Sequence, residues 1–274
     1  MTKITASEVN KLRKMSGSGI MDCKNALVES NGDFDLAIEI LRKKGQKVAA
    51  KRAERESLEG AVIAKVNSNR TKGVIISLNC ETDFVAKNDG FISLANELAE
   101  LALDSNSLEE FLDSKIESMS VSEKLVQQTG VIGEKLIVGS FEKLSAPYVG
   151  KYIHAGNKIA TLSGLSDLGK ENEEIAKNVA MQAAAMNPLA LDEKGVDQAT
   201  IEKEIEIAKD QLRQEGKPEA MLDNIAKGKL KRFFKDNTLV NQTFIKDNKL
   251  TVSEYVNSIN QNSRVTGFKR VALV

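Results

Sequence analysis

The stretch Gly73-Val-Ile-Ile-Ser-Leu-Asn-Cys80 decides the fold, because every second side chain falls on one apolar face, which is the pattern of a β-strand. Residues 61–66 show the same period, and the polar turn Asn67-Ser-Asn-Arg70 separates the two runs. Upstream of Gly60 the apolar residues instead recur at helical spacing. The sequence therefore predicts a helical segment followed by an antiparallel β-hairpin, in a protein of the α+β class.

The N-terminal segment predicts a small bundle of three helices. Thr5-Ala-Ser-Glu8 has the capping-box pattern of a helix start, and Gly17-Ser-Gly19 separates this helix from a second one. Asp33 is placed to cap a third helix, which we expect to stop at Gly45. Short helices in this order predict a domain of the ubiquitin-associated type over residues 1–54.

Downstream, a similar order of strands and helices occurs twice. We expect a helix from about residue 89, shorter helices from about residues 107 and 120, strands over 135–144, 148–154 and 158–165, a helix over 173–186, a capped helix from Thr251 and a final strand from Arg264 to Val274. The recurrence predicts a core of two related α+β subdomains with small antiparallel sheets, residues 55–145 and 146–274.

A helical hairpin is predicted inside the second subdomain. Residues 197–234 are highly charged and carry only a narrow apolar stripe on each of two helices. Gly216-Lys-Pro218 lies between the stripes and reverses the chain direction. The pattern predicts an antiparallel hairpin at about residues 190–236 that projects from the core. A helix pair lying flat on the core is the alternative.

The composition argues against several classes of partner. The 274 residues are 41% hydrophobic, and 39 Lys and Arg balance 39 Asp and Glu, so no overall field attracts nucleic acid or an anionic membrane. No apolar run approaches the roughly 20 residues that cross a bilayer, and we expect a cytoplasmic protein. Cys23 and Cys80 lack metal-ligand or redox spacing and fall at expected core positions, so a thiol enzyme is an alternative without a motif.

The sequence contains no catalytic motif that we recognise. It has no Walker loop, dinucleotide-binding fingerprint, nucleophile elbow or zinc-binding His pair. His154, the one histidine, lies in Tyr152-Ile-His-Ala-Gly156 without an evident catalytic partner. We therefore predict no catalytic residue, no cofactor and no metal site, and a protein that is not an enzyme.

A polar connector, Asn79-Cys-Glu-Thr-Asp-Phe-Val-Ala-Lys-Asn88, follows the strand and contains an aromatic residue, Phe84. Aromatic side chains are scarce, with nine Phe, three Tyr and no Trp, so this position is unusual. Phe84 either folds back over its own sheet or stands exposed as an interface contact, of the kind worth roughly 2–4 kcal/mol when a partner buries it. Asp83 beside it can accept a hydrogen bond or cap a helix.

Two long motifs resemble the bacterial elongation factor Ts family. They are Cys80-Glu-Thr-Asp-Phe-Val-Ala-Lys-Asn88 and Leu12-Arg-Lys-Met-Ser-Gly-Ser-Gly-Ile-Met-Asp-Cys-Lys-Asn-Ala-Leu27. Shorter matches continue in the family's order along almost the whole chain: Asn31-Gly-Asp33, Ala37-Ile38, Leu41-Arg42, Gly45, Ile132-Gly-Glu134, Tyr152-Ile-His154, Met181-Gln-Ala183, Gly216-Lys-Pro218 and Val265-Thr-Gly-Phe268.

The resemblance implies a translation elongation factor, namely a guanine nucleotide exchange factor that promotes GDP release from elongation factor Tu. The implied partner-binding positions are Arg13, Ile20, Met21, Thr82, Asp83, Phe84, Val85, Ile132, Gly133 and His154. Positions of the N-terminal bundle would dock on the GTPase domain of elongation factor Tu, and the Asp-Phe pair would enter between helices of the same domain. Ile132, Gly133 and His154 would belong to the contact surface of the core.

The resemblance leaves two regions open. The family's helical hairpin serves as an accessory or self-association module, and some members carry a further C-terminal helical module after the Val265-Thr-Gly-Phe268 strand. Residues 42–55 form a basic linker that we expect to be a partly helical tether. An RNA-associated translation accessory protein that uses this linker is the alternative function, although direct nucleic-acid binding is not expected.

Overall fold

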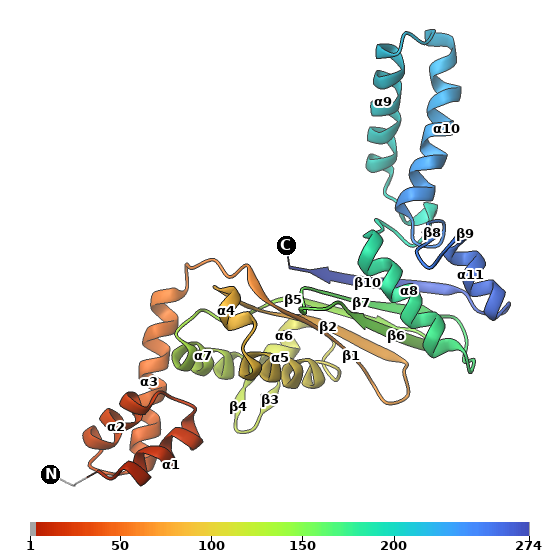
Figure 1. The fold of residues 1–274 in the computed structure, drawn as a ribbon. Coiled ribbons are helices and arrows are strands. Elements are labelled where there is room, and N and C mark those ends of the chain that lie inside the picture. Colours follow the sequence, from red (N-terminus) through yellow and green to blue (C-terminus); the bar gives the residue numbers. More distant parts are fainter. Residues whose placement is uncertain (1–3, 274) are drawn as a thin grey trace.

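The computed structural model describes residues 4–273 and has a mixed α+β architecture (Figure 1). At one end, helices α1 (Ala6–Ser16), α2 (Ile20–Glu29) and α3 (Phe34–Arg52) form the predicted bundle, consistent with the ubiquitin-associated type. Thr5 closes a capping box with Glu8 at the start of α1, as the sequence predicts. The bundle encloses a small apolar core of its own: Val9, Leu12, Cys23, Ala26, Leu27 and Ala37.

Gly45 does not end the third helix, and the prediction of a stop there is wrong. Helix α3 continues to Arg52, so most of the basic linker is helical. Gly45 is buried where α3 crosses α7 (Val121–Ile132), and a Cβ atom added at Gly130 of α7 would lie 2.3 Å from the Gly45 Cα atom. The close crossing therefore depends on Gly130, where a Cβ atom has no room, and Gly45 lies opposite it within a continuous helix. Local sequence cannot distinguish such a position from a helix stop.

The first sheet has the antiparallel strand order β1-β2-β5, and its strands are β1 (Glu59–Val66), β2 (Lys72–Cys80) and β5 (Ile137–Ser145). The predicted hairpin is confirmed, with Ile63 opposite Ile76. Helices α5 (Asp89–Leu101), α6 (Leu108–Asp113) and α7 pack on one face of this sheet. Their shared core includes Ile76, Leu78, Cys80, Phe91, Leu98, Phe111 and Leu125.

The second sheet has the antiparallel order β10-β7-β6, with strands β6 (Tyr148–Ile153), β7 (Ile159–Leu165) and β10 (Val265–Ala272). Helices α8 (Asn172–Met186) and α11 (Val252–Ile259) share its core. A third apolar cluster joins the two sheets face to face: Val62, Ala64, Ile75, Val149, Ala160, Leu162 and Val271. The structure thus confirms two α+β parts with small antiparallel sheets. The end of the last predicted strand, Val274, lies outside the described residues.

Several short elements have no sequence signal that we detected. They are the strand pairs β3 (Lys115–Ile116) with β4 (Met119–Ser120) and β8 (Thr243–Phe244) with β9 (Asp247–Thr251), and the single turn η1 (Glu193–Gly195). Strands β3, β4 and β8 have two residues each and are too short to show an alternating pattern, because a period of two needs at least four residues to be recognised. Strand β9 has five residues, but only Leu250 is apolar, so it shows no alternation either.

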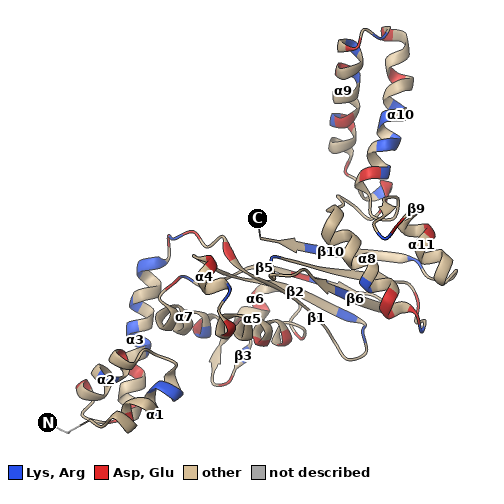
Figure 2. Cartoon of the chain, viewed as in Figure 1, with Lys and Arg blue, Asp and Glu red and all other residues tan. Residues whose placement is uncertain are grey.

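The helical hairpin consists of α9 (Gln198–Gln214) and α10 (Glu219–Asn237) and projects away from the sheets (Figure 1). The alternative of a pair lying flat on the core is therefore wrong. Ion pairs join the two helices, among them Lys209 with Asp223 at 3.0 Å. Both helices carry side chains of both charges (Figure 2). The buried residues of the seam are Ala208, Leu212, Leu222 and Ala226.

Within residues 4–273, none of the helices combines the length and the apolar character that crossing a membrane requires.

Candidate functional site

The polar connector after β2 contains a single helical turn, α4 (Asp83–Ala86), which the sequence did not predict. Thr82 is its N-cap residue, and the Thr82 hydroxyl accepts a hydrogen bond from the Val85 N–H group at 3.4 Å. Asp83 forms an ion pair with Lys87 at 2.6 Å, and the hydrogen bond from Lys87 holds the pKa of the Asp83 carboxyl below its usual value. Asp83 and Phe84 thus belong to an ordered turn instead of an irregular loop.

Phe84 stands exposed, with 83% of its surface accessible. Ala86 is buried under the first sheet, and Val85 is half-buried against the same core. Because successive side chains of a helix point about 100° apart, two inward residues direct Phe84 outward. The interpretation of Phe84 as a plug over its own sheet is therefore wrong, and the exposed interpretation of its side chain is confirmed.

A carboxylate holds the base of this turn. Glu134, which follows the C-terminal end of α7, accepts hydrogen bonds from the backbone N–H groups of Glu81 at 3.1 Å and of Thr82 at 3.0 Å. It also accepts the hydroxyl hydrogen bond of Thr82 at 2.6 Å. Sequence analysis missed this role because 52 positions separate Glu134 from Thr82. The one available signal was that Glu134 lies in Ile132-Gly-Glu134, one of the short runs that resemble the elongation factor Ts family.

Glu81 makes the reciprocal contact with the segment that contains Glu134. Its carboxylate accepts a hydrogen bond from the Lys135 N–H group at 2.7 Å and from the Arg52 guanidinium at 2.8 Å. Burial favours a raised pKa for Glu81, but these two hydrogen bonds hold the pKa of its carboxyl below the usual value. The Lys135 ammonium donates to the Ala53 carbonyl at 2.6 Å. The C-terminal end of α3 and the base of α4 therefore meet at one polar junction.

Ile132 and Gly133 lie directly before this junction. Gly133 is the C-cap of α7 in the left-handed conformation, with φ of 82°, which suits glycine. Ile132 is partly buried against the core of the first sheet. The structure thus places both predicted residues beside the base of α4, with the side chain of Ile132 turned partly inward.

The predicted residues of the bundle surround the turn between α1 and α2. Arg13 is exposed in the last turn of α1, and Ile20 and Met21 begin α2 with 52% and 62% of their surfaces accessible. This turn faces the end of α7, since a Cβ atom added at Gly17 would lie 3.9 Å from the Val131 side chain. The end of α7 therefore lies between the α1–α2 turn and the base of α4.

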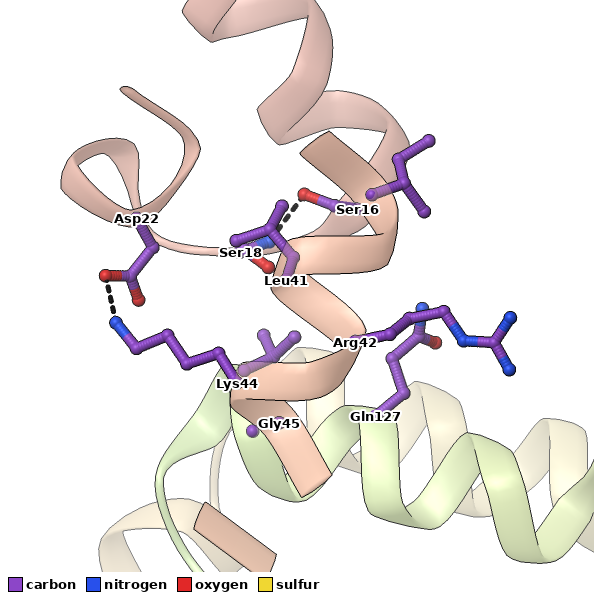
Figure 3. Close-up of a pocket in the computed structure, with 11 residues that line it drawn as sticks. Ser16, Ser18, Asp22, Leu41, Arg42, Lys44, Gly45 and Gln127 are labelled. Atoms are coloured by element: carbon purple, nitrogen blue, oxygen red, sulfur yellow. Dashed lines mark hydrogen bonds and ion pairs between the residues drawn. The ribbon is translucent and has the colours of Figure 1, made fainter. Parts of the chain in front are cut away.

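Figure 3 shows the contact between the bundle and α7. A small cavity of about 20 Å³ lies here between α3, the α1–α2 turn and α7. Lys44 on α3 forms an ion pair with Asp22 on α2 at its edge. A space of this size holds at most about one water molecule, so the two parts are closely apposed.

His154 lies in the turn between β6 and β7 and is exposed. The Tyr152 hydroxyl and the His154 Nδ1 atom are 3.0 Å apart, within hydrogen-bond distance. The Val62 N–H group donates to the Asn157 carbonyl at 2.7 Å, which places this turn beside the start of β1. Because the start of β1 pairs with the end of β2, His154 and α4 lie at the same end of the first sheet.

The described residues of the site present an exposed aromatic side chain, and the two cysteine thiols of the chain are not exposed there. Both cysteines are buried, and burial raises the pKa of the Cys80 thiol to about 12, so it is not a nucleophile at neutral pH. Among the residues that the structure describes, no group of three or more His, Cys, Asp or Glu side chains is arranged to hold a metal ion. An exposed aromatic ring on an ordered turn is suited to burial in a protein partner.

Comparisons with known proteins agree with the resemblance in sequence. The family model described as Elongation factor TS matches residues 81–274. Elongation factor Ts of Christiangramia forsetii is 68% identical over 273 residues, covering 100% of both chains. The protein of the same name from Flavobacterium psychrophilum is 65% identical over 273 residues, again covering 100% of both chains. That of Porphyromonas gingivalis is 44% identical and covers 98% of each chain. The chain therefore belongs to the elongation factor Ts family of translation elongation factors.

Proposed function

We propose that this protein is the guanine nucleotide exchange factor of elongation factor Tu, and that it promotes GDP release without an active site of its own. The observation that carries the proposal is Phe84, an aromatic side chain 83% exposed on an ordered turn. Its relatives of high identity bear the name Elongation factor Ts. An exposed ring of this kind can enter a partner protein directly, since no rearrangement of its own fold is needed.

The mechanism follows from reciprocity between two binding events. A factor that binds nucleotide-free elongation factor Tu more tightly than the GDP-bound form lowers the affinity for GDP by the same ratio. A thousandfold reduction requires a difference of about 4 kcal/mol between the two complexes. One or two buried aromatic or apolar contacts supply roughly this amount. Phe84 therefore acts by separating helices of the GTPase domain, which disturbs the magnesium and phosphate sites at a distance.

The other predicted residues hold the complex together. In this proposal Arg13, Ile20 and Met21 bind the GTPase domain, and the exposed apolar area of the last two supports that role. The core contributes contacts around Gly133 and His154, which lie at the same end of the first sheet as α4.

We also propose the division of the chain into residues 1–54, 55–145 and 146–274. The separate apolar core of the bundle and the two three-stranded sheets support it. The hairpin serves as an accessory or self-association module, and the factor works in the cytoplasm with its partner.

The RNA-binding alternative has no specific observation in its favour. The basic side chains of α3 are in part paired with carboxylates, which leaves less free charge for phosphates. The pairs are Arg42 with Glu123 at 3.8 Å, Lys43 with Glu39 at 2.7 Å, Lys44 with Asp22, and Arg52 with Glu81 at 2.8 Å.

The proposal is tested by the release of a fluorescent GDP analogue from elongation factor Tu at increasing concentrations of the factor. We expect Phe84→Ala to lower the rate at saturation by at least about tenfold, because the contact acts in the complex. Met21→Ala should instead raise the concentration needed for half-maximal release. Leu168→Ala is the matched control, because Leu168 is also apolar and 75% exposed but lies outside the site.

Release at the wild-type rate with saturating Phe84→Ala protein would refute the role of the ring. An equal defect in the Leu168→Ala protein would show that loss of any exposed apolar side chain has the same effect.

A further inference from the structure

We propose that Glu134 is a positioning residue that holds α4 in the orientation in which Phe84 faces a partner. The inference rests on the proposed function and extends it to a residue that does not itself need to touch elongation factor Tu. It follows from the polar junction at the base of α4, which consists of Arg52, Glu81, Thr82, Glu134 and Lys135.

The direction of Phe84 depends on its backbone. With 83% of its surface exposed, the ring has few neighbours in its own subunit that could fix its position. Helix α4 has only four residues, and so short a helix is unstable without external support because helix nucleation is unfavourable. Support must therefore come from the residues at its ends and from the two side chains on its inner face.

Glu134 provides that support at the N-terminal end. The Thr82 hydroxyl carries one proton, which it donates to Glu134 at 2.6 Å. Its lone pairs then remain available to accept the Val85 N–H group at 3.4 Å, the cap of the turn. The carboxylate thus selects the rotamer of Thr82 that caps α4.

The same carboxylate satisfies two backbone donors just before α4, the N–H groups of Glu81 and Thr82. Glu81 in turn accepts the Lys135 N–H group, so the segments at 81–82 and 134–135 bind each other reciprocally. Arg52 balances the negative charge that two neighbouring carboxylates create. Removal of Glu134 leaves three donors without this acceptor, and all three lie at the base of the turn.

Glu134 lies outside the apolar core, so its loss should affect the turn more than the fold. It is half-buried and does not belong to the cluster formed by the first sheet and its helices. Val85 and Ala86 keep their contacts with that cluster when Glu134 is replaced. We therefore expect a folded variant in which α4 samples several orientations, only a fraction of which present Phe84 correctly.

The motion of the turn can be measured without elongation factor Tu. The chain contains no Trp, so Phe84→Trp introduces a single fluorescent reporter. Time-resolved anisotropy should show a fast component from rotation of the exposed side chain in both backgrounds. The amplitude of this fast component should be larger in the Glu134→Ala background, because the backbone of α4 then moves as well. Glu142→Ala is the matched control, because it removes a carboxylate of β5 that pairs with Lys269 at 2.7 Å, away from α4.

The second measurement is GDP release by the variants that retain Phe84. We expect Glu134→Ala to lower the rate at saturation about tenfold, with little change in the concentration for half-maximal release, because the other contacts remain. Glu134→Gln should recover part of the rate, since its amide oxygen can still accept a hydrogen bond. The Glu142→Ala protein should behave as the wild type.

The outcomes separate the two proposals. A larger fast component in Glu134→Ala than in the Glu134 background supports the positioning role even if Phe84→Ala leaves exchange intact, a result that would refute only the proposed function. Unchanged anisotropy in Glu134→Ala, or wild-type exchange by this protein when Phe84→Ala is defective, overturns the positioning role. If Glu134→Ala does not fold, the positioning role is tested with Glu134→Gln by hydrogen exchange of the backbone amides of residues 81 and 82. Faster exchange of these amides than in the wild type supports the positioning role, and an unchanged exchange rate overturns it.

Discussion

Replacement of Gly130 by alanine tests whether the crossing of α3 and α7 fixes the bundle against the core. A Cβ atom at this position would lie 2.3 Å from the Gly45 Cα atom, whereas ordinary contact begins at 3.4 Å. The two helices must therefore separate by about 1 Å or more, because backbone atoms on the opposite helix cannot rotate away. Gly45→Ala is the matched control, since its Cβ atom would lie 3.6 Å from the Gly130 Cα atom, an ordinary contact.

The two substitutions should change the free energy of unfolding in opposite directions. Alanine in a helix interior is favoured over glycine by about 0.5–1 kcal/mol, and overpacking costs about 1–3 kcal/mol. Gly130→Ala should therefore lower the free energy of unfolding by about 1–2 kcal/mol. Gly45→Ala, without the steric conflict, should raise it by up to about 1 kcal/mol.

The assay is thermal and urea unfolding followed by circular dichroism, combined with small-angle X-ray scattering of the native proteins. The scattering detects the case in which Gly130→Ala relieves the conflict by displacement of the bundle. A Gly130→Ala protein that is as stable as Gly45→Ala and has unchanged scattering would contradict the close crossing.

Two further predictions concern buried or paired ionisable groups. The pKa of Glu81 is lowered from its usual 4.5, so its stabilising contribution is present above that pH and is lost as the pH falls through the lower folded-state pKa. Glu81→Gln should therefore be less stable than the wild type at pH 7 in urea unfolding, and the two stabilities should converge as the pH falls below the folded-state pKa. A difference in stability that does not shrink with falling pH would contradict the pairing. Burial raises the pKa of Cys80 to about 12, and Cys23 is also buried. A thiol reagent at pH 8 should therefore label neither cysteine within minutes in the native protein, and should label both after denaturation. Rapid labelling of Cys80 in the native protein would show that the end of the strand is open to solvent.

The sequence predicted most elements that depend on local signals. The capping boxes at Thr5, Ser120 and Thr251 each begin a helix in the structure, because a cap is formed by residues three positions apart. The alternation from Gly73 to Cys80 predicted β2 for a similar reason, since one buried face imposes a period of two.

The errors concern contacts between distant parts of the chain. Gly45 was predicted to end the third helix because glycine ends many helices. Only the position of Gly130 on α7 reveals that α3 crosses another helix at Gly45. The candidate site was predicted in part, since the exposure of Phe84 was one of two interpretations of a scarce aromatic residue. The support from Glu134 joins residues that are 52 positions apart, and no local pattern records such a contact.

In the proposed complex, Phe84 separates two helices of elongation factor Tu, and the side chain is then pushed back with equal force. The turn that carries Phe84 rests through Val85 and Ala86 on the apolar layer beneath the first sheet, and that sheet packs face to face on the second. Close-packed protein interiors have low compressibility. In the proposed complex, the packed layers behind α4 would therefore support Phe84 against this force.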